Sequence, residues 1–180
     1  REPSAKEREQ ARGNGVELQW EPVAKDAFIF ITNYKNPVTN LSQEQLRGIF
    51  TSKIANWNEV GGHDAVIHPY SRDEQSGSQV LMDTLVLKGE QMRRSGADEE
   101  LSYFNTSQVF PLIAHGMGGP YIALTRDEDG IGFTVFYYEQ FMAGSPNTKA
   151  IGVDGVMPTH ETIADGSYPF VTEVYVVIRK

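Results

Sequence analysis

The run at residues 27–32 constrains the fold of this chain more than any other segment. It reads Ala-Phe-Ile-Phe-Ile-Thr, and every residue in it is apolar or favours β-structure. A continuous run of this kind is typical of a strand buried on both faces, whereas a strand with one wet face alternates apolar and polar residues. The run is far shorter than the ~20 apolar residues that a membrane span needs. We therefore expect a buried strand of a globular domain.

Helical and strand patterns alternate along the rest of the chain, which favours the α/β class. A Ser42-Gln43-Glu44-Gln45 capping box is followed by an apolar stripe at Leu46, Ile49 and Phe50, so a helix begins there. The other predicted helices are residues 1–12, 79–87, 108–114 and 159–165. The other predicted strands are residues 16–20, 65–70, 130–135, 150–153 and 172–178.

Composition excludes several classes of function. The length of 180 residues suits one domain, or one and part of a second. A net charge of −8 argues against broad binding to nucleic acid or to anionic membranes, which use a basic face. It leaves a small anion possible, because a local cluster of donors can outweigh a distant negative surface. The absence of cysteine excludes disulfides, thiolate zinc sites and a cysteine nucleophile.

The segment 70–78, Tyr-Ser-Arg-Asp-Glu-Gln-Ser-Gly-Ser, has the composition of an anion site at the start of a helix. The first N–H groups of a helix lack partners and carry a partial positive charge. Ser76 and Ser78 add hydroxyl donors, and Gly77 lets the backbone approach a ligand closely. Arg72 offers a planar fork of donors that suits a tetrahedral oxyanion, and Glu74 could hold that fork in place. The same letters also fit plain helix capping and a surface ion pair.

Other chemical motifs are incomplete. The glycine-rich stretch 116–120 lacks the Lys and Ser of a phosphate loop and favours a flexible loop. The four histidines have no zinc spacing, and no Gly-x-Ser-x-Gly elbow occurs. The acidic turn 127–130 lacks the later glutamate of a calcium loop. We therefore predict no metal, no cofactor and no enzyme activity; a phosphatase on the same fold would need a nucleophile or metal set.

Three groups of residues, in order, resemble the phosphate-binding proteins of bacterial ABC importers, within the type 2 periplasmic-binding-protein fold. The first resembles the opening of the family's second lobe, the next its Arg-x-Asp/Glu-x-Ser-Gly-Thr oxyanion loop, and the last the segment before the chain returns to the first lobe. They are residues 36–50 with 53–62, residues 72–78, and residues 154–159 with Ile163, Gly166, Tyr168 and Pro169.

The resemblance implies one lobe of that fold, a mixed central sheet flanked by helices, with partial strands of the other lobe. It divides the chain into a first-lobe segment with a hinge strand (1–33), the oxyanion-binding second lobe (34–168) and a return strand (169–180). It implies an extracytoplasmic solute-binding component, periplasmic or a surface lipoprotein, that is monomeric and delivers inorganic phosphate to ABC permease subunits. A module for another oxyanion, such as sulfate, tungstate or a phospho-organic molecule, is the alternative.

By position, the resemblance assigns the anion contacts to Arg72, Ser76, Gly77 and Ser78, and it makes Glu74 the residue that orients Arg72. Ser78 stands where the family more often has Thr, and Glu74 where Asp also occurs. Residues 116–129 look longer than the family's usual turn. The family's first-lobe anion loops would precede Arg1 and a last helical segment would follow Lys180, so the chain looks truncated at both ends. We expect these residues alone to bind phosphate weakly or not measurably.

Overall fold

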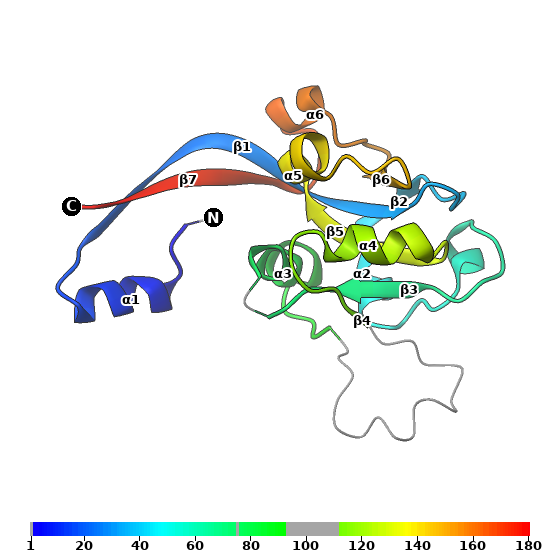
Figure 1. Ribbon diagram of the computed structural model, residues 1–180, viewed down its shortest axis with the longest axis horizontal. Coiled ribbons are helices and arrows are strands. Elements are labelled where there is room, and N and C mark those ends of the chain that lie inside the picture. Colours follow the sequence, from blue (N-terminus) through cyan, green and yellow to red (C-terminus); the bar gives the residue numbers. More distant parts are fainter. Residues whose placement is uncertain (1, 75, 93–111) are drawn as a thin grey trace, which may run out of the picture.

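In the computed structural model, residues 27–32 lie within a long strand, β1 (Leu18–Asn33), and all six are fully buried. The structure describes residues 2–74, 76–92 and 112–180. Through residues 28–33, β1 pairs antiparallel with β5 (Gly130–Val135) on one side and with β6 (Thr148–Val153) on the other. The expected strand with two buried faces is therefore the middle of the sheet (Figure 1).

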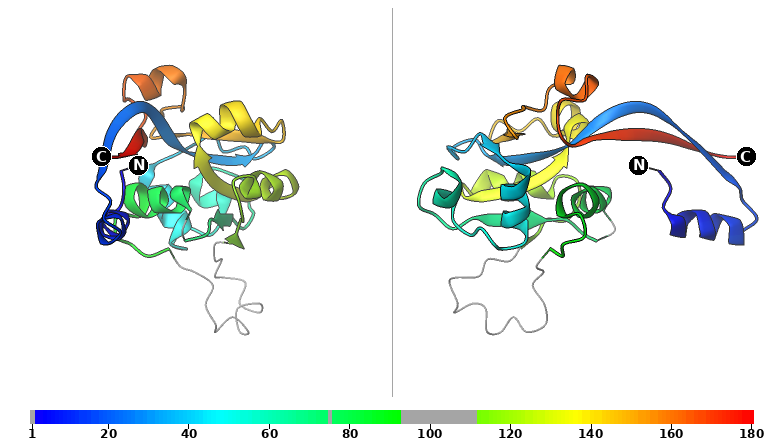
Figure 2. Two further views of the ribbon diagram at one scale, coloured as in Figure 1. Left: turned by 60° about the vertical axis from the view of Figure 1, so that its left-hand side comes forward. Right: turned by 180° about the vertical axis from the view of Figure 1, so that it is seen from behind.

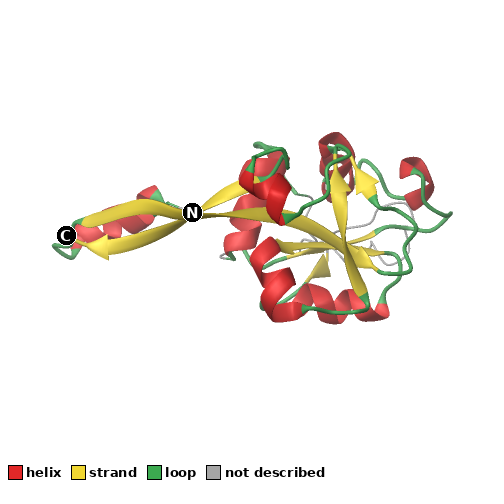
Figure 3. Ribbon diagram, turned by 90° about the horizontal axis from the view of Figure 1, so that it is seen from above, coloured by secondary structure: helices red, strands yellow, loops and turns green. Residues whose placement is uncertain are grey.

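The sheet is mixed, in the order β2-β6-β1-β5-β3-β4. Short parallel pairings flank the antiparallel centre on both sides. On one side β2 (Asn40–Leu41) pairs with β6, and on the other side β3 (His68–Ser71) pairs with β5 and with β4 (Leu112–Ile113). Helices surround this sheet (Figure 3). The architecture confirms the expected α/β class.

The helices have ends that the sequence explains. They are α1 (Ala5–Gly13), α2 (Gln43–Phe50), α3 (Gly77–Leu81), α4 (Gly119–Arg126), α5 (Phe136–Tyr138) and α6 (His160–Ala164), with a 3-10 turn η1 (Trp57–Val60) and π-helical segments η2 (Met82–Leu87) and η4 (Glu139–Ala143). The capping box before α2 is complete, since the Ser42 side chain accepts from Gln45 N–H and the Gln45 side chain accepts from Ser42 N–H. α3 continues into η2, and the residue that follows η2, Lys88, has a left-handed backbone with φ +49°.

An aromatic cluster fills the core on one face of the sheet. Phe30 of β1 lies 5.4 Å from Phe28, 5.9 Å from Phe50 of α2 and 6.1 Å from Phe170, measured between ring centroids. Phe50 also lies 5.6 Å from Phe133 of β5. These edge-on and tilted contacts are the preferred geometries of aromatic pairs. α2 is therefore fixed to the centre of the sheet.

The other half of β1 leaves this lobe. Its residues 18–27 pair antiparallel with β7 (Val171–Arg179), with a register shift between Pro22 and Ala24. The resulting two-stranded ribbon projects from the lobe, and α1 lies at its far end (Figures 1 and 2). Arg8 of α1 lies over the Trp20 ring there, 5.4 Å from its centroid.

Three expectations about the chain's elements were wrong. Residues 16–20 and 27–32 do not form separate strands, because the ribbon with β7 carries β1 through Pro22 by means of the register shift. Residues 112–113 of the expected helix 108–114 form β4, which pairs with β3; residues 108–111 lie outside the described chain. The supposed loop at 116–120 leads directly into α4, with a proline in its first turn. In the part of the chain that the structure describes, no helix is long and apolar enough to cross a membrane.

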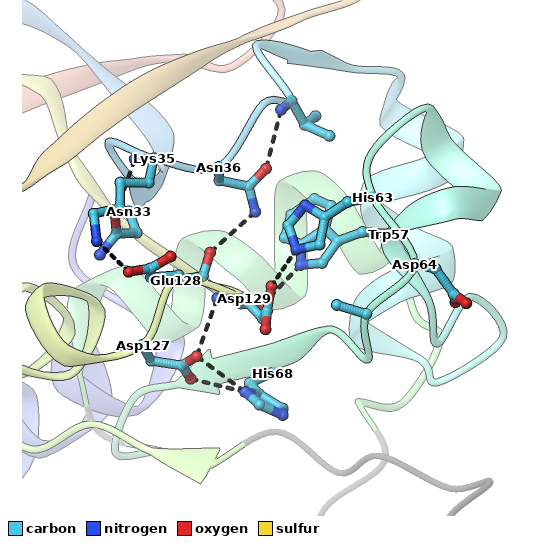
Figure 4. Close-up of polar contacts among 12 residues, drawn as sticks. Asn33, Lys35, Asn36, Trp57, His63, Asp64, His68, Asp127, Glu128 and Asp129 are labelled. Carbon is cyan, nitrogen blue, oxygen red and sulfur yellow. Dashed lines mark hydrogen bonds and ion pairs between the residues drawn. The ribbon is translucent and has the colours of Figure 1, made fainter.

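The turn before β5 is held at the amino ends of β3 and β5 by acidic side chains (Figure 4). The Asp127 carboxylate accepts hydrogen bonds from Tyr70 hydroxyl (2.8 Å) and from Asp129 N–H (3.1 Å), and it pairs with His68 Nδ1 (2.9 Å). Burial, together with Asp127, raises the pKa of Tyr70, so this phenol remains a donor. Asp129 pairs with His63 Nε2 (2.6 Å), and its carbonyl accepts from the indole of Trp57 (2.9 Å).

We expect Asp127→Asn to lower the free energy of unfolding by about 1–3 kcal/mol, because the amide cannot accept all three of these hydrogen bonds. Urea denaturation measures the change. Glu128→Gln is the matched control: this neighbouring acid is exposed and forms an ion pair with Lys35, and its neutralisation should change little. Equal losses in both variants would show that general charge, and not the Asp127 hydrogen bonds, holds the turn.

Candidate oxyanion-binding site

Three strands end together at one edge of the sheet. β3 runs parallel to both β4 and β5, so the carboxyl ends of all three lie at the same edge. Each strand leads into a helix: β3 into α3, β4 into α4 and β5 into α5. In α/β sheets, ligands bind outside the carboxyl ends of the strands, where helix N-termini supply donors. The predicted anion residues lie on the β3–α3 connection.

Arg72 is the first residue after β3, and it is buried, with 5% of its surface exposed. Its guanidinium Nε and Nη1 atoms are buried and make no hydrogen bond with any described residue. Burial lowers the pKa of Arg72, while Asp73 and Tyr138 act in the opposite direction. An arginine side chain remains charged even so, because its ordinary pKa is above 12. A buried cation with open donors is costly unless an anion joins it.

Ser76, Gly77 and Ser78 form the start of α3. Ser76 is the N-cap residue, yet its side chain makes no capping hydrogen bond. The interpretation as plain helix capping therefore lacks the contact that it requires. A Cβ at Gly77 would meet open space, and Ser78 is buried. The β3–α3 connection therefore places Ser76, which makes no capping hydrogen bond, and Gly77 four and five residues after Arg72.

Gln79 is a site residue that the sequence reasoning missed. It is fully buried in α3, and its side-chain oxygen accepts a hydrogen bond from the Arg72 backbone N–H (3.0 Å). Its amide nitrogen donates to Asp83 Oδ1 (2.9 Å), one turn further along. Gln79 therefore ties the backbone of Arg72 to the helix that begins at Gly77. The only signal in the sequence was a glutamine directly after Ser-Gly-Ser, in the first turn of the expected helix.

The orienting acid for Arg72 was predicted to be Glu74. Among the neighbours of the guanidinium, Asp73 and Tyr138 are the groups that raise the pKa of Arg72. The Asp73 carboxylate also pairs with His115 Nδ1 at 2.9 Å, on the connection between β4 and α4. The role of Glu74 stays a prediction. Within the described ranges, no cluster of three or more His, Asp or Glu side chains is arranged to hold a metal ion.

Comparison with known proteins extends the likeness over the whole chain. The sequence profile of the PBP superfamily domain matches residues 1–180. The phosphate-binding protein PstS of Borreliella burgdorferi is 30% identical over 161 residues, which are 86% of this chain and 52% of that protein. PstS of Bacillus subtilis is 29% identical over 132 residues, 73% of this chain and 37% of that protein. The chain thus spans about half the length, or less, of these relatives.

Solved structures of phosphate-binding proteins share the fold of this chain. A structure assigned as a phosphate ABC transporter substrate-binding protein from Clostridium perfringens, with bound phosphate, superposes with a TM-score of 0.76 at 29% identity; the match covers 100% of this chain and 64% of that one. PstS from Borrelia burgdorferi gives a TM-score of 0.67 at 25% identity, with 98% of this chain and 64% of that one covered. The chain belongs to the periplasmic-binding-protein (PBP) superfamily and is a homologue of the phosphate-binding protein PstS.

Proposed function

We propose that this protein binds inorganic phosphate as the extracytoplasmic solute-binding component of an ABC importer. The single observation that carries the proposal is the buried Arg72 guanidinium, whose Nε and Nη1 have no hydrogen-bond partner among the described residues. The relatives named for phosphate binding favour phosphate as the anion. Delivery to permease subunits, and the division into a first-lobe segment (1–33), second lobe (34–168) and return strand (169–180), form part of the same proposal.

The binding energy would come from preorganised donors. Arg72 supplies a charged fork, Ser76 and Ser78 supply hydroxyls, and the start of α3 at Gly77 supplies backbone N–H groups with a partial positive charge. Hydrogen bonds to charged groups contribute about 1.5–3 kcal/mol net each. A micromolar dissociation constant needs about −8 kcal/mol, after the entropy cost of association. We infer that these residues need further donors from the first lobe to bind tightly, consistent with relatives about twice as long.

Titration calorimetry on the full-length gene product tests the proposal. Phosphate, sulfate and molybdate are compared at equal ionic strength, because screening alone changes the apparent affinity of anions. Tight binding of phosphate with weak binding of the others supports the assignment. Preference for sulfate or molybdate would instead make this a binding module for another oxyanion, and binding of none of them would contradict the site itself.

A further inference from the structure

A buried polar layer lies beside Arg72, on the face of the sheet that α4 covers. In the described part of the chain, seven buried side-chain nitrogen or oxygen atoms lack a hydrogen-bond partner. Five of the seven belong to four residues: Arg72 (Nε and Nη1), Tyr121 (Oη), Thr134 (Oγ1) and Glu139 (Oε2). Tyr121 lies close enough to Glu139 and Thr134 for side-chain hydrogen bonds with them to shift its pKa, so these three groups face one another. The Arg72 nitrogen atoms have no such neighbour, and because buried polar groups in native proteins are normally satisfied, they point to an unfilled polar site.

Strand alternation places Thr134 and Tyr70 on the face of the sheet that α4 covers. A Cβ at Gly132 of β5 would lie 3.3 Å from Pro120 of α4, so Gly132 faces α4, and Thr134, two residues later, faces it too. A Cβ at Gly130 would meet both Leu124 of α4 and the Tyr70 ring. Tyr70 therefore shares this face, and Arg72 follows it by two residues.

Tyr138 joins this layer from α5, directly after the carboxyl end of β5. Its ring lies 5.9 Å from the ring of Tyr121, between centroids. A Cβ at Gly118, the N-cap of α4, would lie 3.9 Å from the Tyr138 hydroxyl. The hydroxyl thus lies over the start of α4, at the edge where the anion residues of the β3–α3 connection also lie.

Two further contacts hold the start of α4 beside Ser71, the residue that precedes Arg72. The peptide N–H of Ala114 donates to the carbonyl of Ser71 (2.8 Å), the residue before Arg72, and a Cβ at Gly119 would press on the Ala114 carbonyl carbon at 2.8 Å. The start of α4 is therefore held next to the end of β3. In addition, Tyr138 raises the pKa of both Arg72 and Tyr121, so its phenol lies within electrostatic reach of each.

We propose that Tyr138 is a further anion-contacting residue, whose hydroxyl donates a hydrogen bond to the oxyanion that Arg72 holds. This inference rests on the proposed function. The Tyr138 side chain is half-buried, and its hydroxyl lies beside Gly118 at the start of α4. A phenol donating to an oxyanion forms one of the stronger hydrogen bonds in proteins. Because Tyr138 lies on α5 and not on the Ser-Gly-Ser connection, it would contact the anion from a second side.

The test is Tyr138→Phe, with Tyr137→Phe as the matched control. Tyr137 is the preceding residue, but it is exposed, and its ring packs against Phe141 at 4.9 Å, away from the polar layer. Phosphate affinity is measured by calorimetry on the protein as its whole gene encodes it. We expect Tyr138→Phe to weaken binding about 10- to 100-fold, the range for a hydrogen bond to a charged group, while Tyr137→Phe binds like the unmodified protein. The melting temperatures without phosphate should match.

The outcomes separate this inference from the function on which it rests. Normal binding by Tyr138→Phe, together with loss of binding in an Arg72 variant, would overturn the role of Tyr138 and leave phosphate binding intact. Absence of phosphate binding in the unmodified protein would overturn both. If Tyr138→Phe does not fold, the ring resonances of Tyr138 in the unmodified protein decide. A shift that saturates together with the Arg72 Nε–H resonance as phosphate is added supports the contact, and an unchanged ring resonance excludes it.

Discussion

Arg72→Ala is expected to weaken phosphate binding by about 2–5 kcal/mol, the usual cost of removing one partner from a buried charge pair. The anion would keep the serine hydroxyls and the start of α3, but it would lose the only cationic group assigned to its pocket. Arg72→Lys should recover little of this loss, because an ammonium cannot reproduce the planar fork. Calorimetry on the protein as its whole gene encodes it gives both values.

A different substitution at this position, Arg72→Met, is expected to have the opposite effect on the stability of the ligand-free fold. Because Arg72 is buried with two unpartnered nitrogen atoms, its replacement by Met should leave the melting temperature unchanged or raise it. Arg126→Ala serves as the control, since Arg126 is exposed on the last turn of α4. A loss of phosphate affinity below about 0.5 kcal/mol in Arg72→Ala, the size of an exposed ion pair, would remove Arg72 from the site.

Phe30→Ala is expected to lower the free energy of unfolding by about 3–5 kcal/mol, as a buried phenylalanine leaves a cavity when it is truncated. Phe30 is fully buried at the centre of the sheet and contacts Phe28, Phe50 and Phe170. Urea denaturation of the variant measures the loss.

Phe141→Ala is the matched control, because the same atoms are removed from a ring that is 62% exposed. Its effect should be small, since an exposed ring leaves no cavity. A loss at Phe30 no larger than the loss at Phe141 would mean that the aromatic cluster does not hold α2 to the sheet.

Local patterns predicted those features that local chemistry decides. The burial of residues 27–32 followed from their unbroken apolar run, and the start of α2 followed from the Ser42–Gln45 box, since each depends on neighbouring residues alone. The passage of β1 through Pro22 did not follow. A proline in a strand predicts a break, and only pairing with β7, almost 150 residues later, carries the strand onward.

The candidate site divides in the same way. Arg72, Ser76, Gly77 and Ser78 stand close together in the sequence, so their common position after β3 could be predicted from the motif. The contact of Gln79 with the Arg72 backbone depends on how the connection folds back on α3. The proposed contact of Tyr138 with the anion depends on the parallel pairing of β3 with β5, which no spacing along the chain reveals.

The single long strand β1 also has a mechanical consequence. Its inner half is paired with β5 and β6 in the lobe, and its outer half pairs with β7 along nine residues, which at ~3.3 Å each gives a ribbon of about 30 Å. No loop separates the two halves of β1. A rotation of the structure attached to the ribbon would therefore also turn the strand at the middle of the sheet. The register shift between Pro22 and Ala24 is the position at which the ribbon would bend most easily.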